Sequence, residues 1–180
     1  KLLGKLTPEE ITDYFGSVLF HKTDKEIQDF FLKTAFLPKM TAKMAEELTG
    51  LPNAGSVLLT LNRNNYFTER RFRNEPIYQY HPLFREFLLS RAKETFSTEN
   101  LSVLRTHAAK LLEEAGQTES AVPLLREVSD WEGLVRLITK HAPHMLAQGR
   151  HRPLEDWLNS LPMEILENNP WLLYWMGECR

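Results

Sequence analysis

The fold is decided by the stretch from Tyr66 to Leu88, whose sequence is YFTERRFRNEPIYQYHPLFREFL. Residues 66–68 and 77–80 are aromatic and β-branched, which predicts two strands. The polar residues from Glu69 to Glu75 between them predict a hairpin loop. A helical pattern starts directly after His81. This histidine is therefore expected at the junction between a β-hairpin and a helix.

Short helices are predicted before the hairpin. Thr7 and Thr41 are N-cap residues, Asn53 is a third, and Gly50 provides a helix stop. The predicted helices run from Thr7 to about Phe20, from Asp24 to Pro38, from Thr41 to Leu48 and from Asn53 to Asn64. Helices joined by a short turn and followed by a hairpin are typical of a winged helix.

The remainder of the chain is predicted to be entirely helical. Pro82 suits the first turn of a long helix. Gly116 and Gly149 lie 33 residues apart, and each precedes a similarly patterned helix, close to the repeat of a tetratricopeptide-type helical pair. The matching positions are Ala121, Leu124, Leu125 and Val128 in one helix and Leu154, Trp157, Leu158 and Leu161 in the other. The predicted fold class is mainly α: a winged helix with a small β-hairpin, then a tetratricopeptide-like superhelix.

Composition limits the possible functions. The net charge of −2 gives no general attraction to nucleic acid or acidic membranes. The lone Cys179 cannot form an internal disulfide, and no apolar run approaches the roughly 20 residues of a membrane span. We therefore expect a cytoplasmic protein. The chain opens on Lys1 and stops inside an apolar stretch, so we expect it to be part of something longer.

No catalytic or metal site is predicted. The stretch from Gly50 to Ser56 has two glycines but lacks the lysine of a phosphate-binding loop. His141 and His144 share a helical face without a carboxylate at metalloprotease spacing. The chain alone is therefore not expected to be an enzyme.

DNA binding is the usual function of a winged helix. The predicted recognition helix carries a single cation, Arg63. The hairpin loop holds three arginines that could contact phosphate or DNA, namely Arg70, Arg71 and Arg73. Glu69 and Glu75 partly offset them, and charges over residues 1–95 nearly balance. Weak phosphate contact through the wing stays open.

His81 has two interpretations. It could be a partly buried imidazole bonded to the backbone, which is the commoner role of a lone histidine. A helix start beside an imidazole is also suited to holding a phosphate, through the helix dipole, free amides and a ring nitrogen.

Several segments together resemble the MalT-like, large LuxR-type bacterial transcriptional regulators, which are signal-transduction ATPases with numerous domains. The segments run from Phe30 to Leu37, Met44 to Gly50, Leu58 to Phe67 and Tyr78 to Leu88, with Ala115-Gly116 and Asp130-Trp131-Glu132 further on. The resemblance implies an ATPase module before this chain and a C-terminal helix-turn-helix domain that binds promoter DNA. It assigns residues 1–20 to a helical linker, 21–95 to the winged helix and 96–180 to the repeats.

The resemblance also implies a role for His81. In the wider class, the histidine of a Met-His-Asp motif at the end of the winged helix contacts the β-phosphate of ADP. His81 is similar in position, with Tyr80 and Pro82 in place of the Met and Asp. The implied protein exchanges ADP for ATP, binds a small-molecule or protein effector on its repeats and self-associates when activated. The alternatives are a helical protein-interaction scaffold with a structural winged helix, or DNA binding through the wing.

Overall fold

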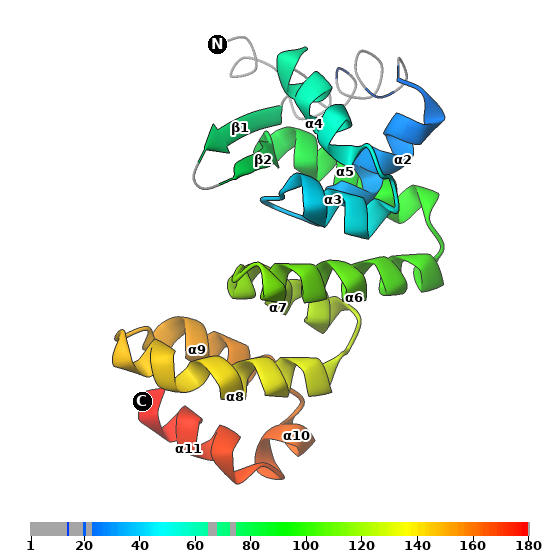
Figure 1. Ribbon diagram of the computed structural model, residues 1–180. Helices are drawn as coiled ribbons and strands as arrows, with labels where there is room; N and C mark the ends of the chain where they lie inside the picture. The colour runs from blue at the N-terminus through cyan, green and yellow to red at the C-terminus, as the bar shows by residue number, and fades with distance from the viewer. Residues whose placement is uncertain (1–13, 15–19, 21–22, 65–67, 73–74, 180) are drawn as a thin grey trace. The chain divides into compact units, whose positions relative to one another are not determined.

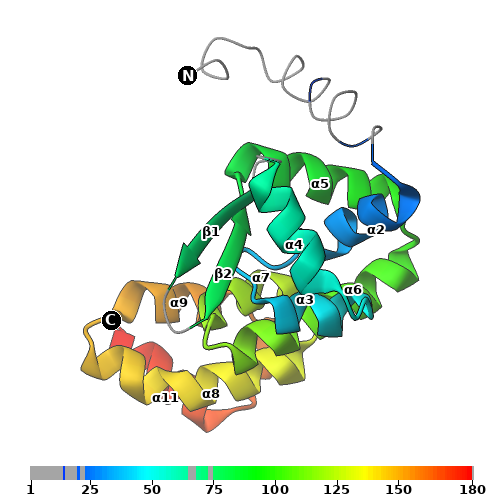
Figure 2. The ribbon, with the colours of Figure 1, turned by 45° about the horizontal axis from the view of Figure 1, so that its top comes forward.

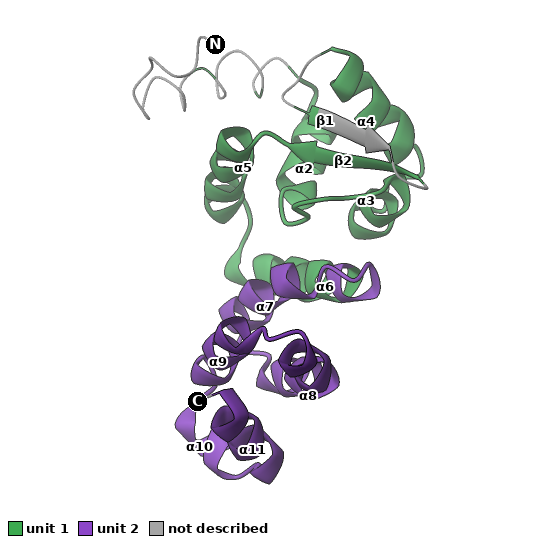
Figure 3. Ribbon diagram, turned by 90° about the vertical axis from the view of Figure 1, so that its left-hand side faces the viewer, with its two compact units in different colours: residues 1–111 green, residues 112–180 purple. Residues whose placement is uncertain are grey.

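The computed structural model describes residues 14, 20, 23–64, 68–72 and 75–179. It divides into two compact units, residues 1–111 and residues 112–180 (Figure 3). Helix α6, Thr98–Glu114, contains the boundary between them. The winged helix predicted at residues 21–95 lies in the first unit. The first predicted helix, Thr7 to Phe20, lies outside the described residues apart from two positions.

The first unit contains three short helices, a hairpin and a longer helix (Figure 1). They are α2 Lys25–Thr34, α3 Ala42–Thr49, α4 Ala54–Arg63, β1 Thr68–Phe72, β2 Pro76–Tyr80 and α5 Pro82–Thr95. The Thr41 hydroxyl caps α3 by accepting the Met44 amide at 3.2 Å, and α3 ends at Gly50, both as predicted. The predicted winged-helix order of elements is confirmed.

Two predicted details are wrong. Asn53 is the N-cap residue of α4, but its side chain makes no capping bond to a described residue. Its carbonyl instead accepts the amides of Ser56 and Val57 at 2.9 and 3.1 Å. The predicted hairpin loop, Glu69 to Glu75, is mostly strand, because residues 69–72 pair with residues 76–79 of β2. Cross-strand backbone hydrogen bonds override the weak β-propensity of these charged residues.

The hairpin is attached to the helices by backbone hydrogen bonds and lies beside α4 (Figure 2). Met40 and Tyr78 form an isolated antiparallel bridge, in which each amide donates to the other carbonyl at 2.9 and 2.8 Å. The core beneath consists of large side chains with almost no exposed surface: Phe30, Phe31, Leu37, Met40, Leu58, Phe84 and Leu88.

The second unit continues with helices of alternating length. They are α7 Thr118–Glu127, α8 Trp131–Ala147, α9 His151–Asn159, α10 Met163–Glu167 and α11 Pro170–Cys179. Helices α6 and α8 both have 17 residues and start 33 residues apart, and α7 and α9 also start 33 residues apart. Gly116 and Gly149, with φ of 71° and 70°, follow the two long helices. The predicted 33-residue repeat is present, and the mainly α fold class is confirmed.

Candidate functional site

His81 lies at the junction of β2 and α5, where the sequence places it. It is the N-cap residue of α5, with φ −56° and ψ 137°, and its carbonyl accepts the Arg85 amide at 2.9 Å. Its side chain is half-buried. Among the described residues, no amide of the first turn is capped by that side chain.

The start of α5 suits an anion. Pro82 occupies the first turn and has no N–H, so Leu83 and Phe84 supply the next backbone donors of this helix end. Every residue of α5 is described, and its first turn contains no acidic side chain. Together with the imidazole, these groups fit a phosphate, because the helix dipole and the N–H donors both favour negative charge.

Tyr80, directly before His81, is bonded to the end of α2. Its hydroxyl lies 2.7 Å from the Thr34 hydroxyl, and both residues are buried. Burial raises the pKa of Tyr80 far above its usual value, whereas the hydrogen bond with Thr34 acts in the opposite direction. The phenol therefore stays neutral at all physiological pH values.

Arg85, four residues after His81, is bonded to the same helix end. Its Nε donates to the Ala35 carbonyl at 2.8 Å. Burial lowers the pKa of the Arg85 guanidinium, and the neighbouring Glu86 partly offsets this. Sequence reasoning did not identify Arg85, Thr34 or Ala35. A threonine among the buried aromatic positions of α2 was the available signal, because a buried hydroxyl requires a partner.

The predicted arginine group of the wing is distributed differently from the expectation. Arg70 and Arg71 are consecutive strand positions, opposite Tyr78 and Ile77 in β2. Successive positions of a strand lie on opposite faces of a sheet, so these two belong to different faces. Arg73 lies outside the described residues.

The recognition-helix position, α4, borders a groove of about 410 Å³ shared with the start of α2. It is lined by Thr23, Asp24, Ile27, Asn53, Ser56, Val57, Thr60, Leu61 and Asn64. No lysine or arginine is among these described lining residues, and Asp24 adds a negative charge. Such a surface does not favour a phosphate backbone.

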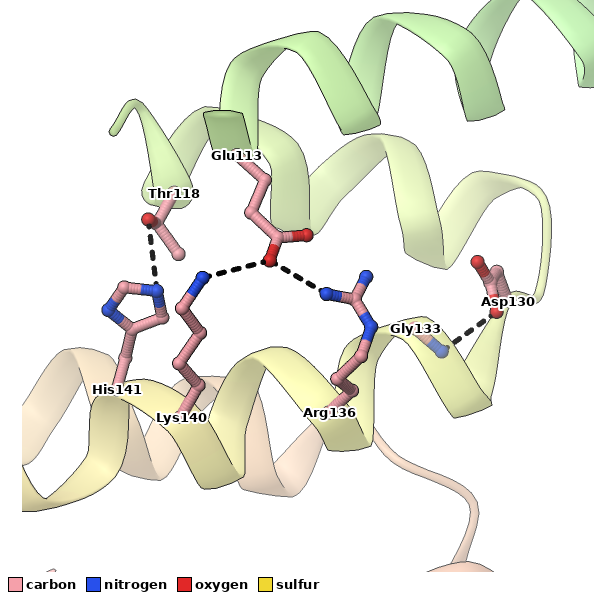
Figure 4. Close-up of polar contacts among 7 residues, drawn as sticks. All are labelled: Glu113, Thr118, Asp130, Gly133, Arg136, Lys140 and His141. Carbon is pink, nitrogen blue, oxygen red and sulfur yellow. Dashed lines mark hydrogen bonds and ion pairs between the residues drawn. The ribbon is translucent and has the colours of Figure 1, made fainter. Parts of the chain in front are cut away.

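A polar cluster in the second unit joins the end of α6 to α8 (Figure 4). Glu113 accepts from Arg136 Nη1 at 2.7 Å and from Lys140 Nζ at 3.4 Å. The hydrogen bond from Arg136 is the main cause of a lowered pKa at Glu113. In the same cluster, His141 Nε2 lies 3.5 Å from the Thr118 hydroxyl, and burial lowers the pKa of His141.

These histidines do not belong to a metal site in the described part of the chain, where no three His, Cys, Asp or Glu side chains are grouped suitably. His144 contacts Gln148, with 2.8 Å between the two nitrogens. Within the described residues, every helix is too short or too polar to cross a membrane.

Comparison with known proteins identifies the winged helix. Residues 17–100, which include α2 to α5, match the family model of the MalT winged helix domain. The chain contains a MalT-type winged helix. The chain is also 27% identical, over 171 residues, to the HTH-type transcriptional regulator MalT of Cronobacter sakazakii. That alignment covers 95% of this chain and 19% of the regulator. The predicted resemblance to MalT-like proteins is therefore confirmed, and His81 lies within the MalT-type winged helix.

Proposed function

We propose that this chain is the regulatory middle part of an ATP-dependent transcriptional regulator that acts in the cytoplasm. In this proposal it links the nucleotide state of a preceding ATPase module to effector sensing by the helical repeats. A transcriptional role is supported by the similarity to a MalT regulator. The chain spans about a fifth of that regulator, so the ATPase module and a C-terminal DNA-binding domain are further parts of the proposal.

The observation that carries the proposal is the position of His81 at the start of α5. ADP would supply phosphate oxygens that accept hydrogen bonds and carry negative charge. The His81 imidazole donates from one ring nitrogen, and the first-turn amides of Leu83 and Phe84 favour the same charge. A winged helix held in this way would remain docked in the closed, inactive state.

Activation requires ligands that bind one state better than the other. An effector, either a small molecule or a protein, would bind the repeats more tightly in an open state. ATP in place of ADP would favour the same state, in which the protein self-associates. The winged helix then acts as a switch element rather than a DNA reader, which agrees with the absence of cations from the α4 groove's described lining.

The test is His81→Ala in the full-length protein. We expect ADP to dissociate about tenfold faster or more, since loss of a hydrogen bond to a charged group costs about 1.5–3 kcal/mol. Basal transcription should rise with it. His151→Ala is the matched control, because it removes an exposed imidazole from α9 in the other unit. Unchanged ADP dissociation and basal transcription in His81→Ala would reject the assignment of His81.

A protein-interaction scaffold is the second candidate function. It is favoured by large apolar side chains that are exposed on the last two helices, namely Met163, Trp171, Leu173 and Tyr174. Exposed apolar surface of this kind commonly marks a contact site. The coding sequence upstream of Lys1 separates the two functions. A phosphate-binding loop with Lys-Ser/Thr there supports the switch, and its absence supports the scaffold.

A further inference from the structure

The residues on either side of His81 are both bonded to the same place, the C-terminal end of α2. Tyr80 contacts Thr34 at 2.7 Å, and Arg85 contacts the carbonyl of Ala35 at 2.8 Å. These partners lie 46 and 50 residues away in sequence. Two adjacent residues of α2 therefore hold both sides of the junction that carries the imidazole.

The direction of these bonds follows from the donor inventory. The Thr34 hydroxyl donates its proton to the Phe30 carbonyl at 2.6 Å, so the Tyr80 hydroxyl must donate to Thr34. Thr34 has no exposed surface and Tyr80 is 3% exposed, so water cannot replace either bond. The arrangement of these hydroxyls is fixed in one direction.

Ring packing fixes the same junction. Phe31 of α2, Tyr80 of β2 and Phe84 of α5 make three mutual edge-to-face contacts, with centroids 5.3 to 5.8 Å apart. Aromatic pairs of this geometry are favourable beyond their buried area. The chain cannot hinge at His81 without breaking these contacts as well as the hydrogen bonds.

We propose that Thr34, Tyr80 and Arg85 are positioning residues, which hold His81 in one place on the winged helix so that its imidazole meets a phosphate correctly. This inference rests on the proposed phosphate contact of His81. The junction does not act as the hinge of the switch. The region from α2 to α5 moves as one body, and the conformational change occurs outside it.

The test uses variants that remove hydroxyl groups and preserve shape. Tyr80→Phe leaves Thr34 bonded to Phe30 and loses one hydrogen bond, whereas Thr34→Val leaves the Tyr80 hydroxyl buried without an acceptor. Thr34→Ser retains the hydroxyl and should restore the wild-type behaviour. Thr41→Ala is the matched control, because it weakens the same domain through the cap of α3 and leaves the junction intact.

Two measurements are made. The first is the dissociation rate of ADP from the full-length protein, which we expect Tyr80→Phe to raise about two- to tenfold, the factor for one net hydrogen bond. Thr34→Val should raise the rate further. The second is the NMR signal of the His81 ring in the 180-residue chain without nucleotide, which should shift in both variants and remain unchanged in Thr34→Ser and Thr41→Ala.

The outcomes are distinguishable from failure of the proposed function. If His81→Ala accelerates ADP release but Tyr80→Phe and Thr34→Val do not, the positioning role is wrong and the phosphate contact stands. If Thr41→Ala changes the ring signal and the rate as much as Tyr80→Phe, general destabilisation explains the effect and the proposal is overturned. If His81→Ala has no effect on ADP, the phosphate contact fails, and an unshifted ring signal in Thr34→Val would reject the positioning role independently.

Discussion

Gly116 and Gly149 each end a 17-residue helix at the same point in the repeat. Each adopts a positive φ, and the amide of the following residue donates five residues back, Gln117 to Leu112 and Arg150 to Met145, both at 2.8 Å. These bonds are those of a Schellman motif, which satisfies carbonyls at a helix end. A side chain in this left-handed conformation is strained.

Replacement of Gly116 by Ala should therefore lower the free energy of unfolding, by about 1 kcal/mol. Gly177→Ala is the control with the opposite expected sign. Gly177 lies inside α11, and an added Cβ there meets no described atom within 4 Å. Alanine in a helix interior is favoured over glycine by about 0.5–1 kcal/mol. Urea denaturation followed by circular dichroism measures both, and equal effects of the two variants would contradict this account.

At the scale of elements, Glu113 joins the end of α6 to α8 through two cations. Its side chain is 11% exposed, whereas those of Arg136 and Lys140 are each 60% exposed. One mostly buried carboxylate therefore holds two flexible side chains from the next helix. Arg150 and Glu119 form a second ion pair, between the start of α9 and α7. In both pairs the acid belongs to the earlier repeat and the base to the later one.

The Glu113 contact should make the second unit acid-sensitive. Arg136 lowers the pKa of Glu113 in the folded state, so the folded state releases this proton more readily than the unfolded chain. Its contribution to stability is complete above the unfolded pKa of about 4.3 and declines as the pH falls through the lower folded value. Glu113→Gln should lose stability at pH 7 and show a flatter decline between pH 5 and pH 3.

Urea midpoints across this pH range provide the measurement. Glu167→Gln, an exposed carboxylate of α10, is the control and should retain the wild-type pH profile. A Glu113→Gln profile parallel to that of the unaltered chain would show that the ion pairs contribute nothing.

Local sequence signals predicted most elements but not the contacts that hold them together. Thr41, Gly50 and Pro82 act through their nearest neighbours, so their roles were visible in the sequence. Strand β1 was largely assigned to a loop, because its charged residues are stabilised by pairing with β2 rather than by their own propensity. Bonds such as Tyr80 to Thr34 join distant segments, and spacing gives no signal for them.

For the candidate site, sequence predicted the position of His81 and not its support. Any imidazole before a proline-initiated helix can be located from the pattern alone. The anchoring of that junction depends on where α2 ends in space, which a linear pattern does not contain. Similarly, the partners of Glu113 lie 23 and 27 residues later, on another helix.

At the scale of the whole molecule, charge opposes direct DNA binding by this chain. The net charge is −2, and the described residues lining the α4 groove include Asp24 and no cation. We expect no measurable binding of the chain to duplex DNA at about 150 mM salt. Fluorescence anisotropy with a labelled duplex tests this, over a series of salt concentrations.

If binding does occur at low salt, the variant Arg70→Ala/Arg71→Ala identifies its origin. Loss of affinity with a shallower salt dependence would support contact through the wing. Affinity that strengthens at low salt and disappears in this variant would contradict the switch role assigned to the winged helix.

The recurrence of one turn at a 33-residue interval gives the second half of the chain a unit of length. Residues 117–149 make up one such unit, and their removal would join Gly116 directly to Arg150, which already follows a glycine of the same conformation. Helix α6 would then lead into α9 through a turn like the one that now leads into α7. Insertions and deletions in this part of the molecule are therefore expected to be tolerated in whole units, whereas a gain or loss of a few residues would rotate every later helix out of its packing.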